Sequence, residues 1–217
     1  GTIDNGAVEF METISLSGGD NFTFVAGAVL AEGKILCANV TEKDGAGYTH
    51  LLRISNQTFE IEYGPRFATS IAGIDANSFD ESNVAVCYWN CANLGANVFV
   101  TKIDENSVQY GPSIPLRAVQ PTVPFAIDAL AVACPDSDTA VVAYIDSARQ
   151  DGIFVSVVKK NGTKLEYCSE NTISLKHGRN VRISSDSFGR VVVTYTVSVD
   201  GHGSIYAKTG NLVGDHI

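Results

Sequence analysis

Hydrophobic and polar positions along this chain alternate in short runs that are typical of β-strands. The stretch from Thr139 to Gly162 shows the pattern most clearly, with an apolar run TAVVAYI, a turn at Asp151-Gly152, a second run IFVSVV and a turn at Asn161-Gly162. β-Branched residues fill both runs, and nothing in the stretch indicates a helix. This pattern predicts two strands joined by a loop.

The same unit is found four times, at a spacing of about 50 residues. The apolar central strands are KILCANV from Lys34, NVAVCYW from Asn83, TAVVAYI from Thr139 and RVVVTYT from Arg190. We align them so that Cys37, Cys87, Ala143 and Thr194 occupy the same place. The loop glycines that follow, Gly45, Gly95, Gly152 and Gly201, keep a similar spacing. The chain is therefore predicted to be an internal repeat.

Each unit adds one apolar strand before the central strand and one after it, and the first three units add a further strand ending in an aromatic residue, as in Tyr63-Gly64-Pro65 and Tyr110-Gly111-Pro112. Four short antiparallel strands in about 50 residues make up a propeller blade. The chain resembles β-propeller proteins in general and no specific family among them. This resemblance implies an all-β, single-domain β-propeller of about four four-stranded blades, at 17–65, 66–112, 113–171 and 172–217 plus 1–16.

The two ends of the chain suggest how such a ring closes. The fourth unit stops after its third strand, near Thr209, and residues 7–11 have the pattern of an outermost strand. A first strand that completes the last blade leaves no unpaired edge, so we expect a ring closed by the N-terminal strand. A part of a longer propeller, or pairing with a second copy, is the alternative.

Composition limits the partners and the compartment. A net charge of -9 with only 15 Lys and Arg residues argues against nucleic acid, and the strand-sized apolar runs argue against membrane insertion. Five cysteines without a C-x-x-C pair predict neither a zinc site nor a disulfide framework, and we expect no cofactor and no metal. Glycosylation sequons favour a secreted or cell-surface glycoprotein; they begin at Asn21, Asn39, Asn56 and Asn161.

The loops between second and third strands, with the blade connections, are expected on one face of a propeller. Candidate ligand-binding residues on this loop face are Trp89, Asn90, Asn93, Asp146, Arg149, His177 and His202. Trp89 is suited to stacking on a sugar ring, and packing against the core is the alternative. We expect a non-catalytic binding or scaffolding module that recognises a glycan or protein, with self-association among its partners.

Two alternatives remain, a glycoside-acting enzyme that uses loop carboxylates and a structural subunit of a larger assembly. Asp44, Asp151 and Asp200 each precede a loop glycine, which is typical of a turn, so we assign no catalytic residue. His177 and His202 match no metal motif. Asp128 interrupts an apolar inner strand, where Arg182 of the next unit is its expected partner.

Overall fold

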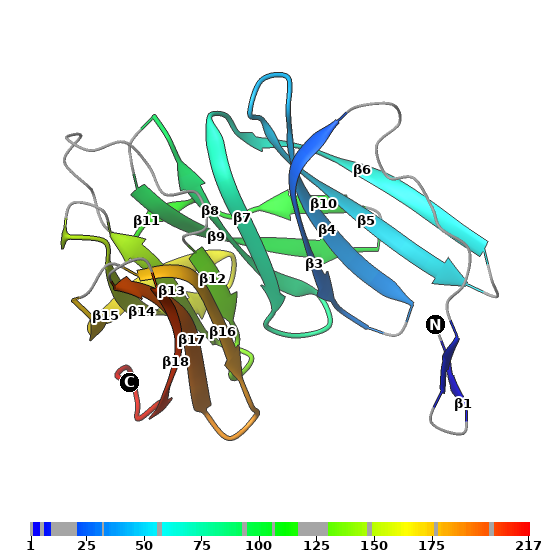
Figure 1. The fold of residues 1–217 in the computed structure, drawn as a ribbon. Helices are drawn as coiled ribbons and strands as arrows, with labels where there is room; N and C mark the ends of the chain where they lie inside the picture. Colours follow the sequence, from blue (N-terminus) through cyan, green and yellow to red (C-terminus); the bar gives the residue numbers. More distant parts are fainter. Residues whose placement is uncertain are drawn as a thin grey trace.

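The computed structural model describes residues 2–4, 7–9, 21–31, 33–55, 58–92, 95–105, 107–116, 130–146, 149–175, 178–199 and 202–217. None of these residues lies in an α-helix, and all the strand pairs among them are antiparallel (Figure 1). The all-β prediction is confirmed.

Four antiparallel sheets follow one another along the chain. The first sheet contains β3 (Phe22–Val29), β4 (Lys34–Thr41), β5 (Gly47–Ser55) and β6 (Thr58–Ala68). The second contains β7 (Ile71–Ser78), β8 (Asn83–Asn90), β9 (Gly95–Asp104), β10 (Ser107–Tyr110) and the short β11 (Ile114–Pro115), which pairs with β9. The third contains β12 (Leu130–Ala133), β13 (Thr139–Asp146), β14 (Gly152–Asn161) and β15 (Lys164–Ser174). The fourth contains β16 (Gly178–Ser185), β17 (Arg190–Val199) and β18 (His202–Asn211).

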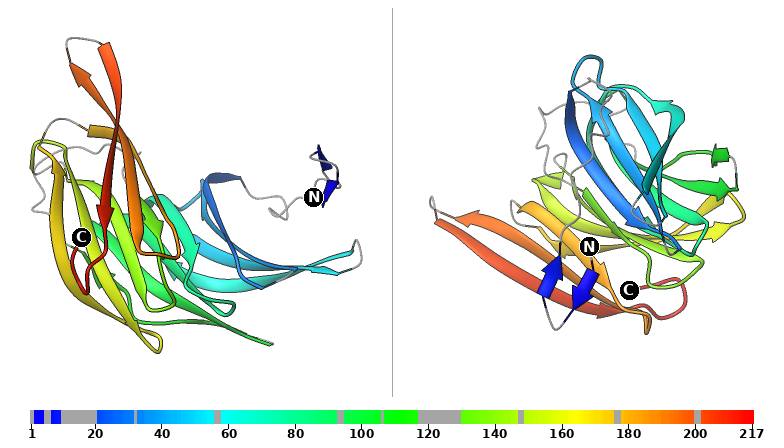
Figure 2. Two further views of the ribbon diagram at one scale, coloured as in Figure 1. Left: turned by 90° about the horizontal axis from the view of Figure 1, so that it is seen from below. Right: turned by 90° about the vertical axis from the view of Figure 1, so that its right-hand side faces the viewer.

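The sheets stack face to face in chain order, and their innermost strands β3, β7, β12 and β16 lie side by side. Three apolar clusters fill the seams between them. Leu36 and Val86 belong to the first cluster, Cys87 and Val142 to the second, and Ala143 and Val193 to the third. Figure 2 shows the result as an open arc with the first and fourth sheets at opposite ends. This order of sheets is consistent with a propeller-like arrangement.

The alignment of the repeats is wrong by one residue in the first sheet. The central strands begin at Lys34, Asn83, Thr139 and Arg190. Ala38, not Cys37, is therefore the counterpart of Cys87. Ala38 packs against the second sheet, whereas Cys37 lies opposite His50 on the other face. Because side chains alternate along a strand, a slip of one residue assigns every side chain to the opposite face.

The expected closure by the N-terminal strand is not what the structure shows. β2 (Ala7–Glu9) pairs with β1 (Thr2–Asp4) in a separate two-stranded sheet, and not with the fourth sheet. Within the described ranges, β18 pairs with β17 alone. The two end sheets of the arc each keep one face outside the stack as a consequence.

Candidate binding surfaces

Arg149 organises a group of charged side chains on the expected loop face. Its Nε donates to Asp146 Oδ2 at 2.5 Å, and its terminal nitrogens donate to the Glu170 carboxylate at 2.6 and 3.0 Å. Tyr144 donates to the same carboxylate, and the guanidinium lies over the ring of Phe154. Burial tends to lower the pKa of Arg149, but these hydrogen bonds outweigh it and raise the pKa. Burial and the bond to Glu170 raise the pKa of Tyr144. Through Arg149 the group links the strands β13, β14 and β15 of the third sheet.

Trp89 is buried between the second and third sheets and is only 6 % exposed. Its Nε1 has no hydrogen-bond partner among the described residues. The neighbouring Asn90 accepts the Ala92 amide through Oδ1 at 2.8 Å, which fixes the turn after β8. These placements favour the packing role of Trp89, because a buried indole has no open face for a sugar ring.

The structure describes only some of the other residues that the sequence singled out. Outside the described residues lie Asn93, His177, Asp200, Asp128 and Asn56. The backbone of His202 pairs with that of Val199 at the start of β18. Of the loop-face set, the structure thus brings together Asp146 and Arg149.

The described sequons differ in accessibility. Asn21 is exposed directly before β3, and Asn161 is exposed at the end of β14, next to Gly162 with a positive φ of 63°. Asn39 lies within β4 and is buried. A folded chain therefore presents Asn21 and Asn161, and not Asn39, to a glycosylating enzyme.

Carboxylates fix several turns through backbone amides, as turn positions predict for aspartate. Asp44 accepts the Ala46 amide at 3.1 Å, which fits its predicted turn role. Three hairpins between first and second strands use an aspartate in the same way: Asp80 accepts the amides of Ser82 and Asn83, Asp136 those of Asp138 and Thr139, and Asp186 those of Phe188 and Arg190. Partial desolvation raises the pKa of Asp186, but these amides and the Arg190 guanidinium outweigh it and lower the pKa. These aspartates have a structural role.

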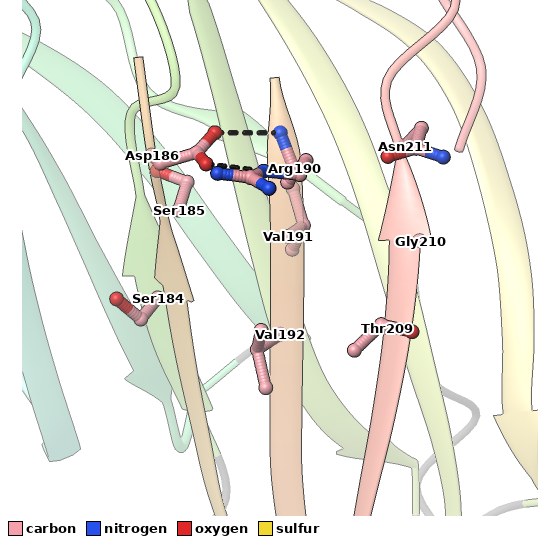
Figure 3. Close-up of a pocket in the computed structure, with 9 residues that line it drawn as sticks. All are labelled: Ser184, Ser185, Asp186, Arg190, Val191, Val192, Thr209, Gly210 and Asn211. Atoms are coloured by element: carbon pink, nitrogen blue, oxygen red, sulfur yellow. Dashed lines mark hydrogen bonds and ion pairs between the residues drawn. The ribbon is translucent and has the colours of Figure 1, made fainter. Parts of the chain in front are cut away.

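A pocket of about 540 Å³ lies at the end of the fourth sheet, beside the hairpin of Asp186 (Figure 3). Asp186 and Arg190 line it and pair with each other at 2.5 Å, and Ser184, Thr209 and Asn211 add hydroxyl and amide groups. This hairpin is at the opposite end of the sheet from the β17–β18 connection, on which the sequence placed the loop face. The pocket was not predicted.

The fourth-sheet outer face is the face of the last sheet that points away from the third. Val193 and Tyr195 pack toward the third sheet, so the alternate residues Val192, Thr194 and Thr196 lie on the outer side. Cross-strand pairing adds neighbours to them: Ser184, Arg182, Thr209, Ala207 and Ile205. Ile205 is 81 % exposed. This face combines hydroxyl groups and the charged side chain of Arg182 with a few apolar side chains.

The first-sheet outer face is the corresponding surface at the other end of the arc. Leu36, Ala38 and Val40 pack toward the second sheet, which leaves Ile35, Cys37 and Asn39 on the outer side. Their cross-strand neighbours on this face are Val25, Val29, His50, Leu52 and Tyr63. Val29 is 66 % exposed and Tyr63 is 60 % exposed. Large apolar side chains of β3 and β6 are therefore exposed on this face, whereas Asn39, His50 and Leu52 on its central strands are buried.

Two polar side chains are buried within the first-sheet outer face. The amide of Asn39 and both ring nitrogens of His50 have no hydrogen-bond partner in the described part of the chain. The ring centres of Phe22 and Tyr63 lie 6.3 and 5.0 Å from that of the imidazole. Burial lowers the pKa of His50 and raises that of Cys37. Desolvated polar groups without a partner are rare and call for an explanation.

The described residues contain no helix long and apolar enough to cross a membrane. They also contain no group of three or more His, Cys, Asp or Glu side chains placed to hold a metal ion.

Comparisons with known proteins add little. No family model matches the chain, and no curated protein matches it. A solved structure of a protein from Lactobacillus plantarum is similar with a TM-score of 0.37 and 11% identity, over 88% of this chain and 72% of that one. A likeness at this level supports no conclusion about this chain.

The two outer faces are candidate binding surfaces that sequence reasoning missed. One signal was present: KILCANV is apolar at both alternating sets of positions, as are the central strands of the second and third units. A continuous apolar run predicts a strand covered on both faces. Among the described residues, another sheet covers β4 on one face only.

Proposed function

We propose that this protein is a non-catalytic scaffolding module of the propeller type, which binds a protein partner on its first-sheet outer face. The observation that carries the proposal is the position of this face in the repeat. Ile35 and Cys37 are the counterparts of Val84 and Val86 in the second sheet, which pack against the preceding sheet. Their counterparts in the third and fourth sheets also pack against a preceding sheet. Only the first sheet lacks such a neighbour among the described residues.

In this proposal the four sheets are propeller blades, and docking replaces the N-terminal strand as the means of completing the ring. Exposed apolar patches on a folded domain are typical of interaction sites. The carboxylates support a non-catalytic role, because Asp80, Asp136 and Asp186 fix turns while Asp146 and Glu170 bind Arg149. The sequons support an extracellular or cell-surface location, which the intact mass of native material tests.

A glycan is a second candidate partner, favoured by the polar lining of the fourth-sheet pocket. Hydroxyl, amide and charged groups beside apolar side chains such as Val192 are suited to a sugar. A glycan array tests this candidate. Binding that is lost on Asn211→Ala supports it, and an array without a hit removes it.

Binding of the apolar dye ANS at low protein concentration tests the proposed docking face. Wild type is expected to enhance the dye fluorescence, and Val29→Asp is expected to remove most of this enhancement. Val213→Asp is the matched control, because Val213 is also exposed, at 74 %, but lies after β18 and outside both outer faces. Wild type that leaves the dye unchanged across a dilution series would refute the proposed face.

A further inference from the structure

We propose that the partner is a second copy of this chain, and that two copies form one ring of eight sheets. In this ring the first-sheet outer face of each copy docks on the fourth-sheet outer face of the other. The inference rests on the proposed function, because it names the partner of the same face. Contacts, position and area each support it.

The two outer faces are complementary by position in the repeat. Val192 and Thr194 are the counterparts of Ala85 and Cys87 in the second sheet, and these two residues pack against the third sheet. The fourth-sheet outer face is thus the kind of face that receives a following sheet. The first-sheet outer face is the kind that packs on a preceding sheet. Joining the two continues the stacking that the chain already uses three times.

The seam between the second and third sheets shows what fills the fourth-sheet pocket in such a joint. Ser184 at the end of β16 has Asn77 as its counterpart in β7, and Asn77 accepts a contact from Cys134 Sγ through its carbonyl oxygen at 3.6 Å. The hairpin aspartate of the second sheet, Asp80, binds Lys160 Nζ of the third sheet at 3.1 Å. Ser184 and Asp186, the counterparts of Asn77 and Asp80, both line the fourth-sheet pocket. In the proposed ring the first sheet of the other copy therefore fills this pocket.

The side chains that each face exposes also suit docking. Val25, Val29 and Tyr63 are exposed on the first-sheet outer face, and Val192 and Ile205 are exposed on the fourth-sheet outer face. Packing these apolar side chains against each other removes them from water and stabilises the joint. Asn39 and His50 are already buried within one copy, so their unpaired groups do not bear on the partner.

Area favours a closed pair of copies over an open chain. Three strands of about eight residues make a face of about 14 by 26 Å, from the usual strand spacing and rise. One such seam buries less than the roughly 1,200 Å² of a stable interface, whereas two seams together reach about 1,500 Å². Head-to-tail contacts that close on themselves also leave no free end. Within one chain the two faces lie at opposite ends of the arc (Figure 2).

Sedimentation equilibrium with matched face variants tests the ring. Wild type is expected to be a dimer of twice the 23.0 kDa chain mass. Val29→Asp and Ile205→Asp are each expected to weaken dimerisation about tenfold or more, because each variant alone carries a charge in both seams. Val213→Asp should dimerise like wild type. An equimolar mixture of the two face variants confines both charges to one seam, so mixed dimers should be tighter than those of either variant alone.

Labelling of Cys37 gives a second readout, because this thiol lies on the first-sheet outer face. Its labelling is expected to slow as protein concentration rises, while that of Cys168, on β15, stays constant. A wild-type protein that remains monomeric overturns the ring but leaves the proposed docking face intact if ANS still binds. The ring is also overturned if neither face variant weakens dimerisation, or if the mixed dimers are no tighter than the dimers of either variant alone. Circular dichroism establishes that each variant is folded.

Discussion

Replacing Arg149 with methionine tests whether the group around it is structural or a binding site. Methionine keeps an unbranched side chain near Phe154 but removes every hydrogen bond to Asp146 and Glu170. Asp146 is 1 % exposed and the side chains of Arg149 and Glu170 are 22% and 20% exposed, so water compensates only in part. Breaking a buried ion pair by removing one partner costs about 3–5 kcal/mol, and partial exposure places this pair at about 3 kcal/mol. For a chain of this length the melting midpoint should fall by roughly 6–12 °C.

Thermal and urea unfolding followed by circular dichroism measure this effect. Arg190→Met is the matched control, because Arg190 forms a similar pair with Asp186 but its side chain is 68% exposed. No measurable change is expected there, since exposed ion pairs contribute little. The double variant Arg149→Met with Glu170→Gln should lose less than the sum of its components, because the two residues interact directly. A loss below about 1 kcal/mol for Arg149→Met would refute the structural role and return Arg149 to the candidate ligand-binding residues.

Three further outcomes follow from the structure. Gly111→Ala should lower the free energy of unfolding by about 2 kcal/mol, because a Cβ there would lie 1.8 Å from the Thr163 carbonyl oxygen. Gly203→Ala is the control, because a Cβ at that position would meet no atom within 4 Å. Equal stability of the two variants in urea would contradict the close approach at Gly111. Burial raises the pKa of Asp75 above its ordinary value of 3.8, so the charged form destabilises the fold as pH rises through the folded pKa. Asp75→Asn keeps an acceptor for the Val132 amide and should be more stable than wild type at pH 7, with the difference vanishing near pH 3; a pH-independent difference in thermal unfolding speaks against this. In a secretory host, Asn161→Gln should remove one glycan from the intact mass, whereas Asn39→Gln, at a buried position, should leave the number of glycans unchanged. A wild-type protein without any glycan would contradict the glycoprotein hypothesis.

The sequence determined the strands and their repetition, because alternation and turn residues act locally. The four central strands begin where the apolar runs begin, at Lys34, Asn83, Thr139 and Arg190. The turn role of Asp44 was also predictable, since a side chain that accepts an amide two residues away needs no distant partner. Local chemistry therefore fixed the elements and several of their connections.

Only the tertiary structure decided which face of each strand is covered. Trp89 and Cys37 both lie in apolar runs, yet Trp89 is buried in a seam between two sheets and Cys37 lies on the first-sheet outer face. The difference depends on whether another sheet, distant in sequence, stacks on that side. The same holds for the two ends of the arc. Closure of a ring depends on the distance in space between the first and fourth sheets, and no local pattern along a strand specifies this distance.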